Sequence, residues 1–177
     1  MMLTDEDTRW LERPELGWES VHLPHEVLEG GFVSGDQSGR RLSVRYYVDR
    51  AASGLRAKVI YGPETQGPPG HAHGGSIAAV LDEAMGGAAW LLGHRAVAAG
   101  LTTQFRTMLP LRTRCIVEAW VVAVEGRKVD VAGALYRADR TLVADAQALF
   151  IEIDPVKLGT LASIADELMT PGKGRSP

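Results

Sequence analysis

The sequence predicts an α+β fold in which one long, buried helix packs against a strongly bent antiparallel sheet. Two observations carry this prediction. Apolar residues repeat with a helical period over residues 75–92, and β-forming runs joined by short turns lie before and after that helix. With 177 residues and 45% hydrophobic content, the chain is large enough to bury one full core. We therefore expect helix-on-sheet architecture.

The first third of the chain starts irregularly and ends in a predicted hairpin. A short helical turn is expected over residues 8–12, and the Gly- and Ser-rich residues 29–39 indicate a loop. β-Forming residues fill 41–49 and 55–61, which are separated by a small-residue turn. Prolines and glycines exclude regular structure over 62–70.

The predicted helix over residues 75–92 is apolar nearly all round. One face holds the larger aliphatic side chains at i, i+3 and i+4 spacing, and the other consists mostly of small residues. A helix of this kind is buried on all sides. Gly86 and Gly87 each cost roughly 1 kcal/mol relative to alanine in a helix interior, so we expect close packing there as compensation.

Four strand candidates follow the helix, at residues 97–108, 115–124, 127–138 and 141–153. Short turns join the last three, which predicts an antiparallel meander. We divide the chain into an N-terminal extension, a main domain, and a short C-terminal helix (158–169) with a disordered tail, at residues 1–40, 41–155 and 156–177. Because one sheet covers only one side of the helix, we expect a homodimer to cover the rest.

Composition excludes several classes of protein. A formal net charge of −3 argues against general nucleic-acid binding, and the first forty residues hold no basic recognition helix. The acidic N-terminus lacks the apolar core of a secretory signal, and no apolar run is long enough to span a membrane. We therefore expect a cytoplasmic protein. The single cysteine, Cys115, excludes an internal disulfide and is predicted to be a small buried hydrophobe.

A histidine and two glycines precede the helix, and two carboxylates lie about two turns into it. The first group is His73-Gly74-Gly75, and the second is Asp82-Glu83. The first turn of a helix offers free N–H groups and the positive end of the dipole. A carboxylate in an apolar helix rarely lacks a partner or a function. The combination predicts half of an active site, with an oxyanion-binding helix start and an acid, base or nucleophile.

These residues also form part of a wider pattern. His73-Gly74-Gly75 is followed by the run Asp82–Gly86, preceded by the loop Gln66–Gly70, and accompanied by a later turn at Val124–Lys128. Over residues 41–154 the chain resembles the hotdog-fold acyl-CoA thioesterases, above all the phenylacetate-pathway-like type with its mitochondrial members. The resemblance implies a helix wrapped by the sheet, and a homodimer or dimer-of-dimers tetramer with a continuous sheet. It also implies active sites at the dimer interface and an acyl-CoA substrate.

The resemblance implies roles for the helix residues. Asp82 is then the general base for water or the nucleophile that attacks the thioester carbonyl. The alternative is an ion pair with a basic group across the interface. Glu83, about 100° round the helix, is the second candidate. Gly75, together with Gly74, would present N–H groups to the thioester oxygen, unless the turn alone requires glycine.

The loop and the strands supply further candidates. His73 is expected to orient the loop or the substrate carbonyl, and Gln66 to bind the attacking water or the loop. Arg127 and Lys128 suit the phosphate oxygens of coenzyme A, although a solvated turn has the same composition. Two further residues are assigned to binding coenzyme A, Thr102 and Thr103. Three arginines could add to the positive charge of Arg127 and Lys128: Arg106, Arg112 and Arg114.

One position departs from the family pattern. Ala98 stands where such enzymes often carry Thr or Ser, which affects the expected rate and mechanism but not the fold. His71 and His73 alternate in an extended loop without further ligands nearby, so we expect no metal site, and coenzyme A enters only as part of the substrate. Three aromatic residues are expected in the core or an interface, one of them lining the acyl pocket: Trp90, Trp120 and Phe105.

We conclude from the sequence that an acyl-CoA thioesterase is the function to test. It would hydrolyse the thioester to a carboxylic acid and free coenzyme A. A non-catalytic acyl-CoA sensor or scaffold on the same fold is the alternative, and Ala98 favours it. A hotdog dehydratase would need a histidine base at a different spacing, which the sequence does not contain.

Overall fold

A computed structural model describes residues 3–24, 31–36, 38–159 and 163. The helices are α1 (Asp5–Glu12), the 3-10 turn η2 (Pro63–Thr65), α2 (Gly74–Leu91) and α3 (Pro155–Leu158). The strands are β1 (Trp18–Val21), β2 (Leu42–Asp49), β3 (Gly54–Tyr61), β4 (Ala96–Phe105), β5 (Arg114–Glu125), β6 (Lys128–Arg137) and β7 (Leu142–Glu152). The predicted helix over 158–169 lies mostly, and the predicted tail entirely, outside the described residues.

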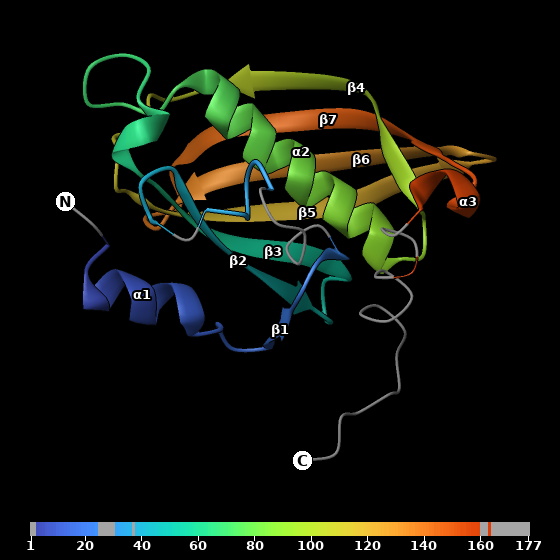
Figure 1. Ribbon diagram of the computed structural model, residues 1–177, viewed down its shortest axis with the longest axis horizontal. Helices are drawn as coiled ribbons and strands as arrows, with labels where there is room; N and C mark the ends of the chain where they lie inside the picture. Colours follow the sequence, from blue (N-terminus) through green and yellow to red (C-terminus); the bar gives the residue numbers. More distant parts are fainter. Residues whose placement is uncertain (1–2, 25–30, 37, 160–162, 164–177) are drawn as a thin grey trace.

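All seven strands form one antiparallel sheet in the order β1-β2-β3-β5-β6-β7-β4. The hairpin of β2 and β3 and the meander of β5, β6 and β7 are confirmed. Figure 1 shows α2 lying across one face of this bent sheet. The chain then passes to the far edge, where β4 pairs with β7 and is the last strand of the sheet among the described residues. The predicted arrangement of one long helix against a bent antiparallel sheet is therefore confirmed.

Helix α2 fills the concave side of the sheet. Its buried side chains include Ile77, Val80, Leu81, Ala84 and Met85, which belong to the same core as residues of β2, β3, β5, β6 and β7. Burial of such aliphatic groups stabilises the fold by ~1.5–3 kcal/mol per side chain.

The two central glycines of α2 confirm the expected close packing. A Cβ on Gly87 would come within 2.6 Å of Leu23 Cδ1 and 2.9 Å of Leu55 Cδ2. A Cβ on Gly86 would lie 3.3 Å from Phe150 Cε1. The helix can therefore approach the core this closely only with glycine at position 87.

The N-terminal residues contain a helix that is longer than the predicted turn over residues 8–12, and a strand that was not predicted. Helix α1 begins at Asp5, because the side chain of Thr4 caps it and the Asp7 carboxylate reaches back to Thr4. Strand β1 was not predicted at all. With only four residues and no regular alternation of buried positions, it leaves little signal.

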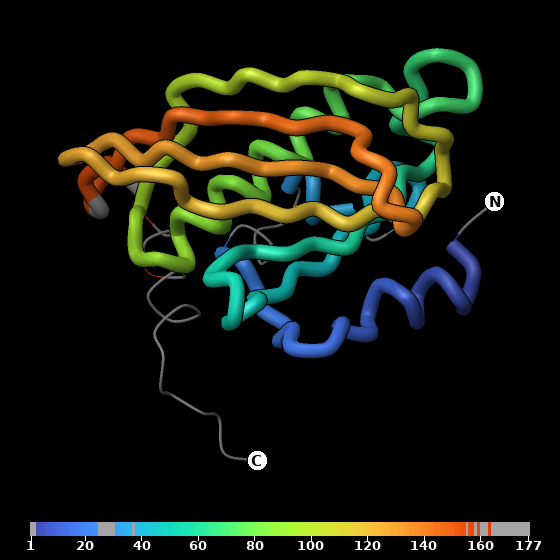
Figure 2. The backbone as a smooth tube through the Cα atoms, turned by 180° about the vertical axis from the view of Figure 1, so that it is seen from behind, coloured from blue at the N-terminus to red at the C-terminus, as the bar shows by residue number. Residues whose placement is uncertain are grey.

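Helix α1 packs on the opposite side of the sheet from α2, over β2 and β3 (Figure 2). Lys58 of β3 is almost fully buried there, and its Nζ binds the carbonyl oxygens of Trp10 at 3.1 Å and Arg13 at 2.6 Å. The same ammonium lies 2.6 Å from a carboxylate oxygen of Glu15. A buried cation satisfied in this way fixes the end of α1 against the sheet.

Strand β4 is the exposed edge of the sheet. Apart from Ala96 and the half-buried Thr103, its residues are exposed on both faces. The large apolar side chains Leu101 and Phe105 are 39% and 55% exposed. An uncovered apolar edge strand is unusual in a monomer.

Candidate active site

The start of α2 is built from the side chain of His73 and two glycines. The N–H of Gly75 donates to Nδ1 of His73 at 2.9 Å, so the imidazole caps the helix. The N–H of Gly74 makes no hydrogen bond within the described part of the chain. A Cβ on Gly74 would lie 3.1 Å from Cζ of Phe105, and one on Gly75 would lie 3.0 Å from Nδ1 of His73. Both glycines therefore allow close approach, one to a ring and one to the cap.

The loop before α2 holds His73 in place. The N–H of His73 donates to the carbonyl of Thr65 at 2.7 Å. Gln66 Oε1 accepts a hydrogen bond from Gly70 N–H at 3.0 Å, which closes the loop. Of the two roles expected for Gln66, the structure shows the contact to the loop. Contact with an attacking water stays a prediction.

Asp82 is a half-buried carboxylate, and its Oδ1 is buried without a hydrogen-bond partner among the described residues. Burial raises the pKa of Asp82 above its usual range, and the nearby charge of Glu83 adds to the rise. The side chain lines an open cavity of about 470 Å³ between α2 and β4, together with Gly75, Ala98 and Gly100. A carboxylate that is hard to ionise and lacks a partner is a candidate functional group.

Glu83 lies on a different side of α2. It accepts a hydrogen bond from the hydroxyl of Tyr46 at 2.5 Å, and Tyr46 belongs to the buried core. Glu83 does not line the cavity that contains Asp82. The structure therefore separates the two carboxylates: Asp82 lines the cavity, whereas Glu83 is hydrogen-bonded to Tyr46.

The candidate residues of one chain fall into separated groups. Asp82 follows Gly75 by seven positions in the helix, which corresponds to about 10.5 Å along the axis. Arg127 and Lys128 lie at the turn between β5 and β6, at the end of the sheet opposite the start of α2 (Figure 1). Arg127 donates from Nε and Nη2 to the carbonyl of Glu152, at 3.0 and 2.8 Å. One chain alone does not bring these groups together.

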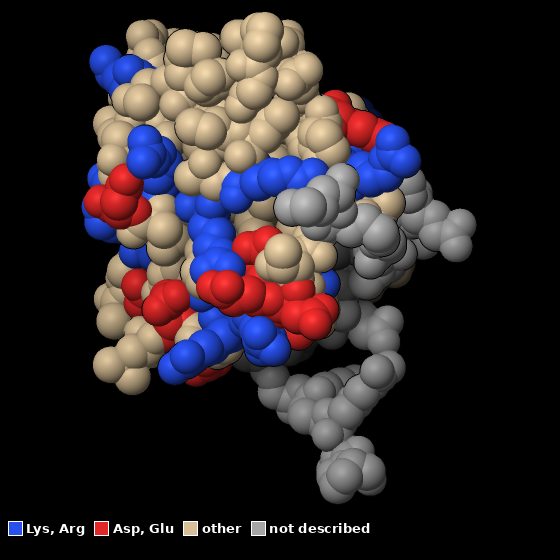
Figure 3. Space-filling model, turned by 90° about the vertical axis from the view of Figure 1, so that its left-hand side faces the viewer, with Lys and Arg blue, Asp and Glu red and all other residues tan. Residues whose placement is uncertain are grey.

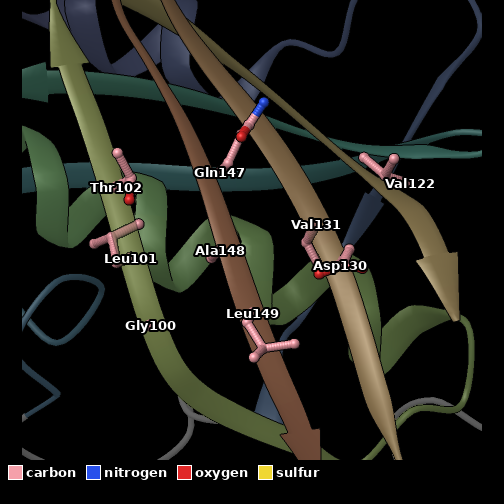
Figure 4. A pocket seen from close by; sticks show the side chains of 9 residues that line it. All are labelled: Gly100, Leu101, Thr102, Val122, Asp130, Val131, Gln147, Ala148 and Leu149. Carbon is pink, nitrogen blue, oxygen red and sulfur yellow. The ribbon is translucent and has the colours of Figure 1, made fainter. Parts of the chain in front are cut away.

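The two threonines of β4 lie on opposite faces of the sheet. Thr103 pairs with the buried Ala146 and faces α2, whereas Thr102 pairs with the exposed Gln147. Figure 4 shows Thr102 and Gln147 in a groove of about 590 Å³ on the face away from α2. The structure therefore does not place Thr102 beside Asp82.

Two of the three arginines that could extend the basic surface form ion pairs with acidic side chains. Arg106 pairs with Asp145 at 2.6 Å, and Arg114 pairs with Glu6 and Asp7 of α1. The described residues contain no group of three His, Cys, Asp or Glu side chains that could hold a metal ion. His71 instead contacts the carbonyl of Pro69.

The other single residues are placed as follows. Cys115 is buried, as predicted, and burial raises the pKa of its thiol to about 12.

Trp90 donates from Nε1 to the carbonyl of Ala96 at 2.8 Å. Trp120 is 40% exposed. No helix within the described ranges is long and apolar enough to cross a membrane.

Comparison with known proteins shows which protein superfamily has this sequence pattern. Residues 69–144, which include the start of α2, Asp82 and strands β4 to β6, match the thioesterase superfamily. Over these residues the chain is similar to the thioesterase superfamily. The hotdog-fold resemblance inferred from the sequence is therefore confirmed, and the matched segment contains every residue that lines the cavity of Asp82.

Relatives and solved structures agree with the superfamily match. An acyl-coenzyme A thioesterase, THEM4 of Xenopus laevis, is 31% identical over 121 residues, which are 68% of this chain and 54% of the relative. A solved thioesterase superfamily protein is 30% identical, with a TM-score of 0.58, over 62% of this chain and 53% of that one. A Streptococcus mutans protein bound to acetyl-CoA shares the fold, with a TM-score of 0.55 and 17% identity, over 57% of this chain and 82% of that one. The chain spans about half the length of the first two proteins.

The part that sequence reasoning missed is an apolar cavity beside Gly74. Its walls come from the loop before α2, the start of α2 and the segment after β4. Because three segments that are far apart in the sequence form this cavity, no local sequence pattern predicts it.

Proposed function

We propose that this protein hydrolyses an acyl-CoA thioester to a carboxylic acid and free coenzyme A. The observation that carries the proposal is Asp82, whose side chain lines an open cavity and whose buried Oδ1 has no hydrogen-bond partner among the described residues. It lies in the segment that is similar to the thioesterase superfamily. The names of two similar proteins support an acyl-CoA substrate. The Xenopus relative is called an acyl-coenzyme A thioesterase, and the Streptococcus mutans neighbour was solved with acetyl-CoA bound.

The chemistry follows from the charge that develops on the carbonyl oxygen. The N–H of Gly74 and the dipole of α2 would stabilise the oxyanion as the attacking oxygen bonds to the carbonyl carbon, whereas the N–H of Gly75 already donates to Nδ1 of His73. In one route Asp82 accepts a proton from the attacking water. In the other, Asp82 attacks and a mixed anhydride is then hydrolysed. In both routes the C–S bond breaks, and the coenzyme A thiolate leaves and is protonated.

The two groups need a second subunit to meet. Asp82 and the helix start of its own chain are about 10.5 Å apart along the axis, too far to act on one carbonyl. We propose an antiparallel homodimer through the β4 edge, in which Asp82 of one subunit faces the helix start of the other. Such pairing would also move Arg127 and Lys128 toward the partner's helix start, where coenzyme A phosphates are expected.

The direct test is thiol release from a panel of short, long and aromatic acyl-CoA esters. Asp82→Asn is expected to lower kcat by roughly 10²–10⁴-fold, the usual contribution of a positioned acid or base. The matched control is Asp130→Asn, an exposed carboxylate in the groove on the outer face of the sheet. Glu83→Gln tests the second carboxylate. Equal losses in Asp82→Asn and Asp130→Asn would contradict the assignment.

A non-catalytic acyl-CoA sensor or scaffold is the second candidate. The observation that favours it is Ala98, which lines the cavity of Asp82 with a methyl group where related enzymes often have a hydroxyl. Binding of acyl-CoA without thiol release from any ester would establish this function instead.

A further inference from the structure

An apolar cavity of about 260 Å³ opens beside the first residue of α2. Six of its ten lining residues have apolar side chains, Gly74 is the seventh, and the remaining three are polar or charged. The apolar residues are Pro68, Ala72, Ile77, Phe105, Met108 and Leu109, and the polar ones are His71, Arg106 and Thr107. Two large side chains of this set, Phe105 and Met108, are 55% and 57% exposed. Large apolar groups gathered around a hollow are typical of a ligand site.

The walls of this cavity are held by backbone hydrogen bonds. Ala72 N–H donates to the carbonyl of Leu109, and Leu111 N–H donates to the carbonyl of Gly70, both at 2.9 Å. His71 and Pro110 form an isolated bridge between the same two segments. The loop before α2 and the segment after β4 are thus tied together, so the cavity exists before a ligand arrives.

Gly74 and Gly75 face different cavities. Gly74 lines the apolar cavity, and Gly75 lines the cavity that contains Asp82. A thioester bound by the first-turn N–H groups has two arms, the acyl group and coenzyme A. The start of α2 therefore lies between a hollow with apolar walls and a hollow with the reactive carboxylate. Figure 3 shows that the upper part of this end of the molecule carries almost no charged side chains.

We propose that the cavity beside Gly74 binds the acyl group, and that Phe105 and Met108 determine which acyl groups are accepted. This assignment rests on the proposed thioester substrate. At roughly 30 Å³ for a water-sized group, the cavity holds about nine such groups, which suits a compact aliphatic or aromatic acyl chain. The ring of Phe105 lies against Gly74, so its size sets the space next to the carbonyl carbon.

The test compares hexanoyl-CoA with dodecanoyl-CoA as substrates and as ligands. Phe105→Ala and Met108→Ala are expected to shift the ratio of kcat/KM roughly tenfold or more toward the longer chain, as expected when an apolar pocket changes by a few methylene groups. Trp120→Ala, which removes an exposed aromatic side chain of β5 outside this cavity, is the control and should leave the ratio unchanged.

The ratio of the Kd values for hexanoyl-CoA and dodecanoyl-CoA is measured in an Asp82→Asn background, in which the esters are not expected to be hydrolysed during the measurement. A shift in Kd without hydrolysis by any form would support the acyl site and overturn the proposed hydrolase. Hydrolysis with an unchanged chain-length ratio in both variants would overturn the acyl site alone. Loss of the dimer in Phe105→Ala and Met108→Ala, with the ratio unchanged, would also overturn it, since a second copy would then occupy the cavity.

Discussion

Two neighbouring glycines in α2 allow a sharp test of how the helix packs. Replacing either by alanine improves helix propensity by ~1 kcal/mol. At position 87 the added methyl would meet Leu23 and Leu55 at 2.6 and 2.9 Å, and both leucines are fully buried. Overpacking of this kind costs typically ~1–3 kcal/mol. At position 86 the nearest atoms are Cε1 and Cζ of Phe150 at 3.3 and 3.8 Å, so a small shift of the ring relieves the contact.

Because the propensity gain is common to both variants, Gly87→Ala should be ~1–3 kcal/mol less stable than Gly86→Ala. For a chain of this size each kcal/mol corresponds to about 2–4 °C in Tm. Urea unfolding and thermal melts at one fixed protein concentration measure the difference, since dimerisation would make both depend on concentration. Equal stability of the two variants would refute the packing argument, whatever their stability relative to wild type.

Three further predictions concern the candidate site. Gly74→Pro removes the free N–H at the first helical position, where proline is tolerated, whereas Gly74→Ala keeps it. We expect a lower kcat for the proline variant at similar stability, measured by thiol release and melting. The raised pKa of Asp82 means that the folded state holds its proton more tightly, so stability falls as pH rises from about 3.9 to that raised pKa. Asp82→Asn should be the more stable protein at pH 7, and the gap should close in acid during urea unfolding at a series of pH values. Ala98→Thr places a hydroxyl in the cavity of Asp82 and should raise kcat about fivefold, the value of a hydrogen bond of ~1 kcal/mol; an unchanged kcat would remove the hydroxyl from the mechanism.

The architecture could be predicted because it depends on periodicity. The helical repeat of α2 extends over eighteen residues, and the hairpin and meander are marked by short turns. Strand β1 and the start of α1 were harder to predict. The first is four residues long, and the second is marked only by the capping pair of Thr4 and Asp7.

The candidate site was predicted in part for a physical reason. His73, Gly74 and Gly75 are neighbours in sequence, so their local role as cap and helix start is readable from the residues. Thr102 and Thr103 are also neighbours, but side chains alternate along a strand, so they face opposite sides of the sheet. The cavity beside Gly74 is formed by three segments that are far apart in the sequence, so the pattern within any one of them does not predict it.

Strand β4 connects these observations to the proposed dimer. Edge strands of monomers are commonly protected from pairing by charged side chains or proline. The ten residues of β4 contain neither, and only a bulge between Ala98 and Gly100 interrupts the ladder with β7. The strand that is left open for pairing also forms the wall opposite Asp82. If two subunits pair through this free edge, the distance between Asp82 and its own helix start is explained. Each active site then takes Asp82 from one subunit and the helix start from the other.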